Sequence, residues 1–216
     1  MKFYPALYTT VMVKALLDKR KTQTRRLGNL KMINESPDSW SFEGLGKNPE
    51  KENDTRLYAY FKTGIDTWTY CLSPFGQKGD VIWVRETWSE MGLKYNYVYK
   101  ADGLCLETDN DRWFPSIFMP KNACRLFLKI TNVRIERLND ISEHDANAEG
   151  VLSVKFTPGQ ETRRKKGKPA FGWKIPYRFA FEKLWEKING FGSWDKNPFV
   201  WVYDFEQIDE PESFNP

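Results

Sequence analysis

Residues 124–138 read CRLFLKITNVRIERL, a long stretch in which apolar and polar residues alternate. The apolar residues from Leu126 to Ile130 fall on one face of a strand, because successive side chains of a strand point to opposite faces. Val133 continues the pattern only after a slip of one position near Asn132. Such a slip predicts a β-bulge or bend, and a sheet that closes into a barrel needs such bends. The stretch therefore favours a barrel in which one long strand curves.

Other segments carry weaker signals of the same kind. Further strands are expected at residues 21–27, 81–88, 95–100 and 199–205, which are rich in β-branched and aromatic residues. Short helices are expected at residues 7–18, 142–150 and 177–188. This order does not alternate regularly, so the sequence predicts an α+β fold, a mixed β-barrel with short flanking helices. We expect a single domain over residues 1–216 with two insertions, a partly irregular one at 28–75 and an exposed loop at 152–175.

The clearest local signal is the segment from Ile141 to Gly150. Ser142 is a suitable N-cap, and Gly150 is a suitable residue to end the helix. Glu149 then lies in the last helical turn, where the helix dipole favours cations and not a carboxylate. Glu149 is therefore either simply solvated or part of a site that uses its charge.

Composition excludes several classes of site. The chain of 216 residues has three cysteines without a CxxC pair, and His144 is its one histidine. A disulfide framework, a structural zinc site and a Ser-His-Asp triad are therefore not expected, and neither is any metal or cofactor. A net charge of +4 permits nucleic-acid contact without requiring it. The N-terminal apolar stretch is too short to span a bilayer and has no cleavage site, so we expect no membrane partner and a cytoplasmic protein.

The stretch from Ala15 to Arg26 resembles the signature of the ASCH family, a branch of the PUA-like superfamily, in which a helix runs into a strand reading G-x-K-T-x-T-x-R. Lys19 is a departure, since many members carry glycine there. Other segments are similar to ASCH proteins of bacteriophage and prophage genomes: residues 78–80, 83–88, 113–120, 140–151 and 197–202. The resemblance covers nearly the whole chain except the two insertions, and it implies a PUA-like mixed β-barrel.

Small ASCH proteins include amidohydrolases that remove the acetyl group from N(4)-acetylcytidine without a metal. The resemblance places their catalytic residues at Lys21, Thr24 and Glu149. A lysine that is desolvated beside Arg25 or Arg26 has a lowered pKa and suits a general base. Thr24 would be the nucleophile or would hold a water, and Glu149 would orient the lysine or move a proton.

This site requires a turn or bulge at residues 20–22. In a regular strand Lys21 and Thr24 would point to opposite faces. Side chains on opposite sides of the barrel wall would contradict the catalytic interpretation.

A structural interpretation of the same residues stays open. Lys21 is also consistent with a surface lysine, and Glu149 with an ion pair to Arg25 or Arg26 that has no catalytic role. We expect substrate contacts from Arg25, Arg26, Trp83 and Arg85. The basic run is expected either to be a solvated loop or to contact nucleic acid through Arg163, Arg164, Lys165 and Lys166.

Two functions follow, with a nucleoside or RNA as the partner. The first is an amidohydrolase that removes an acyl group from an N-acylated pyrimidine nucleoside or a related modified base. The second is a non-catalytic PUA-like module that binds RNA or modified nucleic acid, for which the aromatic content of 16% would supply stacking surfaces. A bacteriophage protein that binds a host protein is a third possibility. The residue types at Lys21, Thr24 and Glu149 favour the first function. The sequence does not give an oligomeric state.

Overall fold

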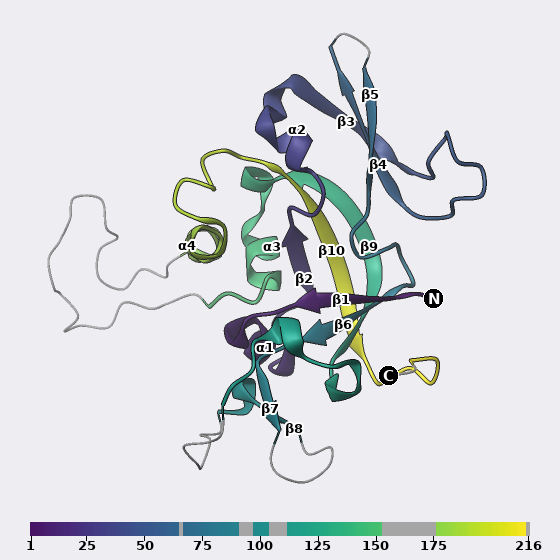
Figure 1. Ribbon diagram of the computed structural model, residues 1–216. Helices are drawn as coiled ribbons and strands as arrows, with labels where there is room; N and C mark the ends of the chain where they lie inside the picture. Colours follow the sequence, from purple (N-terminus) through teal and green to yellow (C-terminus); the bar gives the residue numbers. More distant parts are fainter. Residues whose placement is uncertain (65–66, 91–96, 104–111, 153–175, 215–216) are drawn as a thin grey trace, which may run out of the picture.

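The computed structural model describes residues 1–64, 67–90, 97–103, 112–152 and 176–214, which form a mixed α+β fold (Figure 1). The helices are α1 (Thr10–Leu17), α2 (Lys31–Glu35), α3 (Glu143–Ala148) and α4 (Tyr177–Asn189). The strands are β1 (Phe3–Leu7), β2 (Gln23–Arg26), β3 (Trp40–Gly46), β4 (Tyr58–Thr63), β5 (Trp68–Leu72), β6 (Val81–Arg85), β7 (Trp88–Glu90), β8 (Tyr97–Tyr99), β9 (Phe127–Arg137) and β10 (Phe199–Ile208).

The main sheet has five strands in the order β1-β6-β9-β10-β2, of which only β1 and β6 are parallel. Its long strand β9 bends as it crosses the sheet (Figure 1). Asp204 of β10 pairs with Asn132, and Phe205 pairs with Ile130, so Thr131 between them has no partner. The predicted bulge is therefore confirmed, one residue from the position at which the alternation slips.

The described part of the main sheet is open, and the expected closed barrel is not found there. Its edge strands are β1 and β2. Nη2 of Arg26 in β2 donates to the carbonyl of Leu7, the last residue of β1, over 3.0 Å. A side chain thus connects the two edges where a closed barrel would have a backbone ladder.

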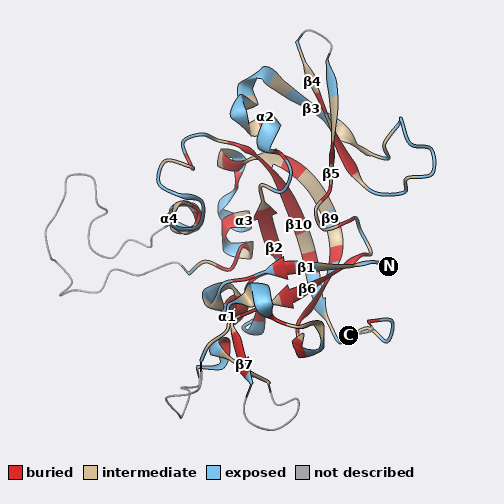
Figure 2. Ribbon diagram, in the orientation of Figure 1, coloured by how far each residue is buried: buried red, intermediate tan, exposed pale blue. Residues whose placement is uncertain are grey.

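The main sheet is buried on both faces because β10 carries apolar residues at successive positions. Trp201 and Tyr203 belong to the large core cluster on one face. Val200 and Val202 belong to a second cluster, formed with α3 and α4, on the other face. Figure 2 shows the buried residues gathered in this sheet. The continuous apolar run of β10 is the pattern expected for a strand that is covered on both sides.

The first insertion is more regular than the sequence predicted. It contains α2 and an antiparallel sheet in the order β3-β4-β5, which projects beside the main sheet (Figure 1). Phe61 of β4 packs edge to face on Phe199 of β10, with ring centres 5.2 Å apart. Most of the second insertion lies outside the described residues.

The predicted helices are confirmed with small changes at their ends. Ser142 caps α3 by accepting from the N–H of Asp145 over 3.0 Å, and Gly150 follows the helix at φ 85°. The predicted strand at 81–88 is interrupted, since β6 ends at Arg85 and β7 begins at Trp88. No helix in the described ranges is both long and apolar enough to cross a membrane.

Candidate active site

A tight turn between α1 and β2 sets the position of Lys21. Lys19 adopts φ 56°, and the N–H groups of Arg20 and Lys21 both donate to the carbonyl of Ala15, over 2.9 and 3.0 Å. The N–H of Thr22 donates to Ala148 of α3 over 2.9 Å. Lys19 thus adopts the left-handed conformation, which is uncommon for a residue other than glycine. The turn that the predicted site required is present, and Lys21 lies outside the regular strand.

Lys21 and Glu149 form a buried ion pair although 128 positions separate them. Nζ of Lys21 lies 2.6 Å from Oε2 of Glu149 and also donates to the carbonyls of Glu149, over 3.0 Å, and Gln23, over 2.8 Å. These contacts use all three N–H donors of an ammonium group. Burial lowers the pKa of Lys21; the Glu149 carboxylate opposes this shift, and the charges of Arg26 and Arg25 add to it.

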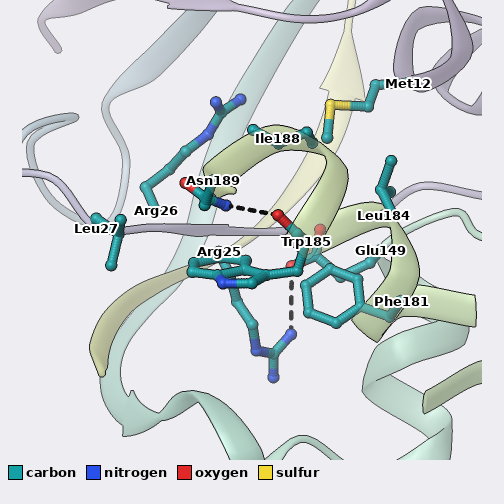
Figure 3. A pocket seen from close by; sticks show the side chains of 10 residues that line it. All are labelled: Met12, Arg25, Arg26, Leu27, Glu149, Phe181, Leu184, Trp185, Ile188 and Asn189. Carbon is teal, nitrogen blue, oxygen red and sulfur yellow. Dashed lines mark hydrogen bonds and ion pairs between the residues drawn. The ribbon is translucent and has the colours of Figure 1, made fainter. Parts of the chain in front are cut away.

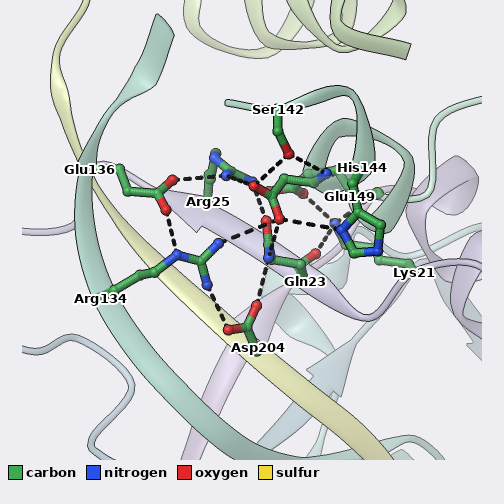
Figure 4. Close-up of polar contacts among 10 residues, drawn as sticks. Lys21, Gln23, Arg25, Arg134, Glu136, Ser142, His144, Glu149 and Asp204 are labelled. Atoms are coloured by element: carbon green, nitrogen blue, oxygen red, sulfur yellow. Dashed lines mark hydrogen bonds and ion pairs between the residues drawn. The ribbon is translucent and has the colours of Figure 1, made fainter. Parts of the chain in front are cut away.

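Arg25 connects this pair to further carboxylates (Figure 4). Its Nη1 lies 3.3 Å from Oε1 of Glu149 and also donates to Gln23. Its Nη2 lies 2.9 Å from Glu136 and 3.8 Å from Asp145. The side chain of Arg25 is fully buried, so its charge is balanced within the protein.

The polar network extends across the sheet from α3 to β10. Arg134 of β9 pairs with Asp204 of β10 over 2.6 Å and also with Glu136. Gln23 donates to both Asp145, over 3.2 Å, and Asp204, over 2.5 Å. The network therefore fixes the side chains on one face of β2 to three other elements and holds the Lys21–Glu149 pair in place.

Thr24 lies on the other face of β2. It pairs with Tyr203 in the ladder, whereas Arg25 pairs with Val202, and directly opposed residues of an antiparallel pair share a face. Thr24 is buried, and no hydrogen bond among the described residues joins it to Lys21 or Glu149. The structure thus brings together two of the three predicted catalytic residues.

Tyr8 neighbours Thr24 on that face. Burial raises the pKa of its phenol, and the adjacent Arg26 and Thr24 side chains lower it in part. None of its neighbours in the described chain meets the Tyr8 hydroxyl with hydrogen-bond geometry. Arg26 lies over the Tyr8 ring, with Cζ 4.9 Å from the ring centre, and 6.0 Å from the centre of Phe75.

A pocket opens beside the free edge of β2 (Figure 3). It is open to solvent, and its empty space of about 420 Å³ includes the solvent at its mouth. Three predicted residues line it, Arg25, Arg26 and Glu149, together with Met12 and Leu27. Arg25 and Arg26 point to opposite faces of β2, yet both line the pocket, because β2 is an edge strand and the pocket lies along its unpaired side.

Helix α4 forms the opposite wall of the pocket, which the sequence did not predict. It contributes Phe181, Leu184, Trp185, Ile188 and Asn189. The apolar stripe of α4 was visible in the sequence, but a stripe of this kind equally predicts packing on a core. Phe181 and Trp185 do both, since they are buried in the cluster under α3 and also line the pocket.

Other predicted contacts lie elsewhere. Trp83 is buried in a cluster with Phe127 and Phe214. Arg85 donates to the carbonyl of Met119 over 2.9 Å. Neither Trp83 nor Arg85 lines the pocket. The basic residues Arg163, Arg164, Lys165 and Lys166 fall outside the described part of the chain.

The described residues contain no group of three or more His, Cys, Asp or Glu side chains arranged to hold a metal. Comparisons with protein-family models, characterised proteins and solved structures found no match to this chain. The site itself presents a carboxylate, that of Glu149, which lines the pocket and is paired with a lysine whose pKa is lowered by burial.

Proposed function

We propose that this protein is a metal-independent amidohydrolase that removes an acyl group from an N-acylated pyrimidine nucleoside or a related modified base. The observation that carries the proposal is the buried Lys21–Glu149 pair, whose carboxylate lines a pocket that opens to solvent. A lysine with a lowered pKa, paired with a carboxylate beside a cleft, is a typical candidate for acid–base chemistry.

In the proposed reaction a water oxygen adds to the acyl carbonyl carbon while neutral Lys21 accepts a proton from that water. The bond between the acyl carbon and the exocyclic nitrogen then breaks. Lys21 returns its proton to the leaving nitrogen, so that a carboxylic acid and the free amino base are released. Neutral lysine has one N–H donor fewer than the ammonium, so one of its three contacts to Glu149 and Gln23 must be released.

In this scheme the nucleophile is water and not the hydroxyl of Thr24. The Thr24 side chain is directed to the Tyr8 face of β2, and no contact within the described chain connects it to Lys21. Glu149 accepts from both Lys21 and Arg25, so its charge orients the lysine. Thr24 would then contribute packing on the Tyr8 face of β2.

The proposal keeps the resemblance to bacteriophage-type ASCH proteins and, with it, a PUA-like architecture. Two local features support it. The bulge bends β9, as a strand of a PUA-like barrel must bend. The end of α3 brings Glu149 to the turn that carries Lys21. The alternative, a non-catalytic RNA-binding module, would use a groove of the barrel, the Arg25–Arg26 pair and the basic run, which lies outside the described residues.

The test is release of cytidine from N(4)-acetylcytidine by the purified protein. We expect Lys21→Met to abolish release, because methionine keeps the length of the side chain but has no basic nitrogen. The rate for the unchanged protein should rise with pH through a pKa below that of an ordinary lysine, since the neutral amine is the active form. Lys14→Met changes an exposed lysine on α1 and should leave release unaltered.

Thermal unfolding of each variant shows whether loss of release reflects loss of folding. A folded, unchanged protein that releases no cytidine would contradict the amidohydrolase proposal. RNA affinity that falls steeply with salt would then favour the binding module. Equal release by Lys21→Met and the unchanged protein would remove Lys21 from the chemistry.

A further inference from the structure

Two neighbouring arginines line the pocket, and their charges are balanced very differently. Arg25 lies near three carboxylates, Glu136, Asp145 and Glu149. Arg26 has no carboxylate partner within the described ranges. Its Nη2 donates to the carbonyl of Leu7, its side chain also contacts the Tyr8 hydroxyl, and its Nε is buried without a partner among the described residues. Arg26 is thus a cation at the pocket whose charge the described residues leave unpaired.

The side chain of Arg26 is nevertheless held in place. Its guanidinium lies over the ring of Tyr8, with Cζ 4.9 Å from the ring centre, and 6.0 Å from the centre of the Phe75 ring. Contacts of this type favour a cation and fix the plane of the guanidinium. The Leu7 bond fixes one of its ends. A guanidinium that is pre-positioned and still has free N–H donors is suited to recognise a phosphate or carboxylate.

The charged residues of the pocket differ in how deeply they are buried. Glu149 and Arg25, almost fully buried, form the inner end, whereas Arg26 is partly exposed. A ligand anion would be repelled by Glu149, so the anionic part of a ligand belongs beside Arg26. The uncharged acylated base then belongs at the inner end beside Glu149, where the proposed chemistry takes place.

We propose that Arg26 binds the phosphate of the substrate, so that the preferred ligand is a pyrimidine nucleoside monophosphate and not the neutral nucleoside. This inference rests on the proposed function for the identity of the base. The anion site itself follows from Arg26 alone. A mononucleotide is favoured over an RNA chain because Arg25 is already paired with carboxylates, so the lining cations offer one place for a phosphate, beside Arg26.

The experiment compares N(4)-acetylcytidine with its 5′-monophosphate as substrates. We expect the phosphate to lower KM about tenfold in the unchanged protein, the effect of one charge-assisted contact. In Arg26→Gln the ratio of the two KM values should fall to about one. Arg56→Gln is the matched control: Arg56 also lies over a tyrosine ring, that of Tyr58 in β4, and the ratio should persist.

Binding of cytidine and cytidine 5′-monophosphate, measured by calorimetry, separates the two proposals. Tighter binding of the monophosphate that Arg26→Gln removes would support the anion site even if nothing is hydrolysed. Hydrolysis of the nucleoside without any gain from the phosphate would overturn this inference and leave the proposed function intact. An acetylated oligonucleotide that is preferred over the monophosphate would overturn the assignment to a mononucleotide.

Discussion

At the scale of single residues, the Tyr8 hydroxyl is buried and has no hydrogen-bond partner in the described chain. An unpaired buried hydroxyl costs free energy, because it leaves water without gaining a partner. We predict that Tyr8→Phe raises the free energy of unfolding by about 1 kcal/mol. The ring under Arg26 is retained in this variant. Urea denaturation of the two proteins measures the difference.

Tyr203→Phe is the matched control for this prediction. The Tyr203 hydroxyl is also buried, but it lies 2.8 Å from Oγ of Ser73 and accepts from the N–H of Phe75 over 3.4 Å. Its removal takes the partner of the Phe75 N–H and one of the two hydrogen bonds of Ser73 Oγ, which also donates to the carbonyl of Gly76, and should lower the free energy of unfolding by about 1–2 kcal/mol. If both variants lose stability equally, the Tyr8 hydroxyl has a partner after all.

The same scale shows what the sequence could not predict about the site. Periodicity places Lys21 near a strand and Glu149 at a helix end, but it does not join residues 128 positions apart. Only the family resemblance put them in one site. Thr24 was grouped with them by motif, yet alternation along β2 turns it toward Tyr203. The aromatic residues of α4 were visible, but their stripe predicts core and pocket equally.

At the scale of elements, Gly150 lets the end of α3 approach the turn that carries Lys21. Gly150 has φ 85°, and a Cβ there would lie 2.7 Å from Cβ of Ala15 and 2.8 Å from Cβ of Lys21. Both neighbours are held by backbone contacts, so they yield little. We predict that Gly150→Ala separates α3 from α1 and lowers stability by the backbone cost plus roughly 2 kcal/mol of overpacking.

Gly103→Ala isolates the backbone contribution. Gly103 has a similar φ of 79°, but a Cβ there would meet none of the described residues within 4 Å. Its substitution should cost only about 1 kcal/mol, the penalty of the left-handed conformation. Unfolding midpoints of the two variants measure the difference. Equal losses would show that α3 does not need the close approach, and the glycine would then matter only for its backbone conformation.

Elements with a strong local signal were predicted, including β10, which is covered on both faces. The strand β1 was not predicted, and the helix expected from residue 7 begins at Thr10. Alternation identified β9 and its bulge, and capping residues identified α3. The strands β3–β5 were missed because glycine interrupts β3 and aromatic residues occupy successive positions, which hides the period of two. The predicted strand at 81–88 was too long, since the pattern cannot show that the chain leaves the sheet after Arg85.

At the scale of the whole molecule, closure of the sheet depends on contacts that no local pattern encodes. The bend in β9 was taken to imply a barrel, but the described strands leave β1 and β2 as edges. A bend is necessary for closure and does not by itself bring distant edges together. The hydrogen bond from the Arg26 side chain to the carbonyl of Leu7 joins the two edges without backbone pairing.

The final prediction concerns whether the small sheet β3-β4-β5 folds together with the main sheet. Phe61 in its central strand is fully buried, and its ring lies 5.2 Å from that of Phe199 in β10. Both rings belong to one core cluster. Phe61→Ala should therefore lower the stability of the whole chain by about 3–5 kcal/mol. Hydrogen exchange should rise together in β4 and β10, in one cooperative transition.

Trp68→Ala is the control, because Trp68 belongs to the same small sheet but is 45% exposed and should cost less than about 1 kcal/mol. A Phe61→Ala protein in which β4 exchanges fast while β10 stays protected would mean that the small sheet unfolds alone. The main sheet would then be an independent unit and the insertion a separate domain. A joint loss instead makes the insertion part of the scaffold that positions β10, and through β10 the strand that carries Arg25 and Arg26.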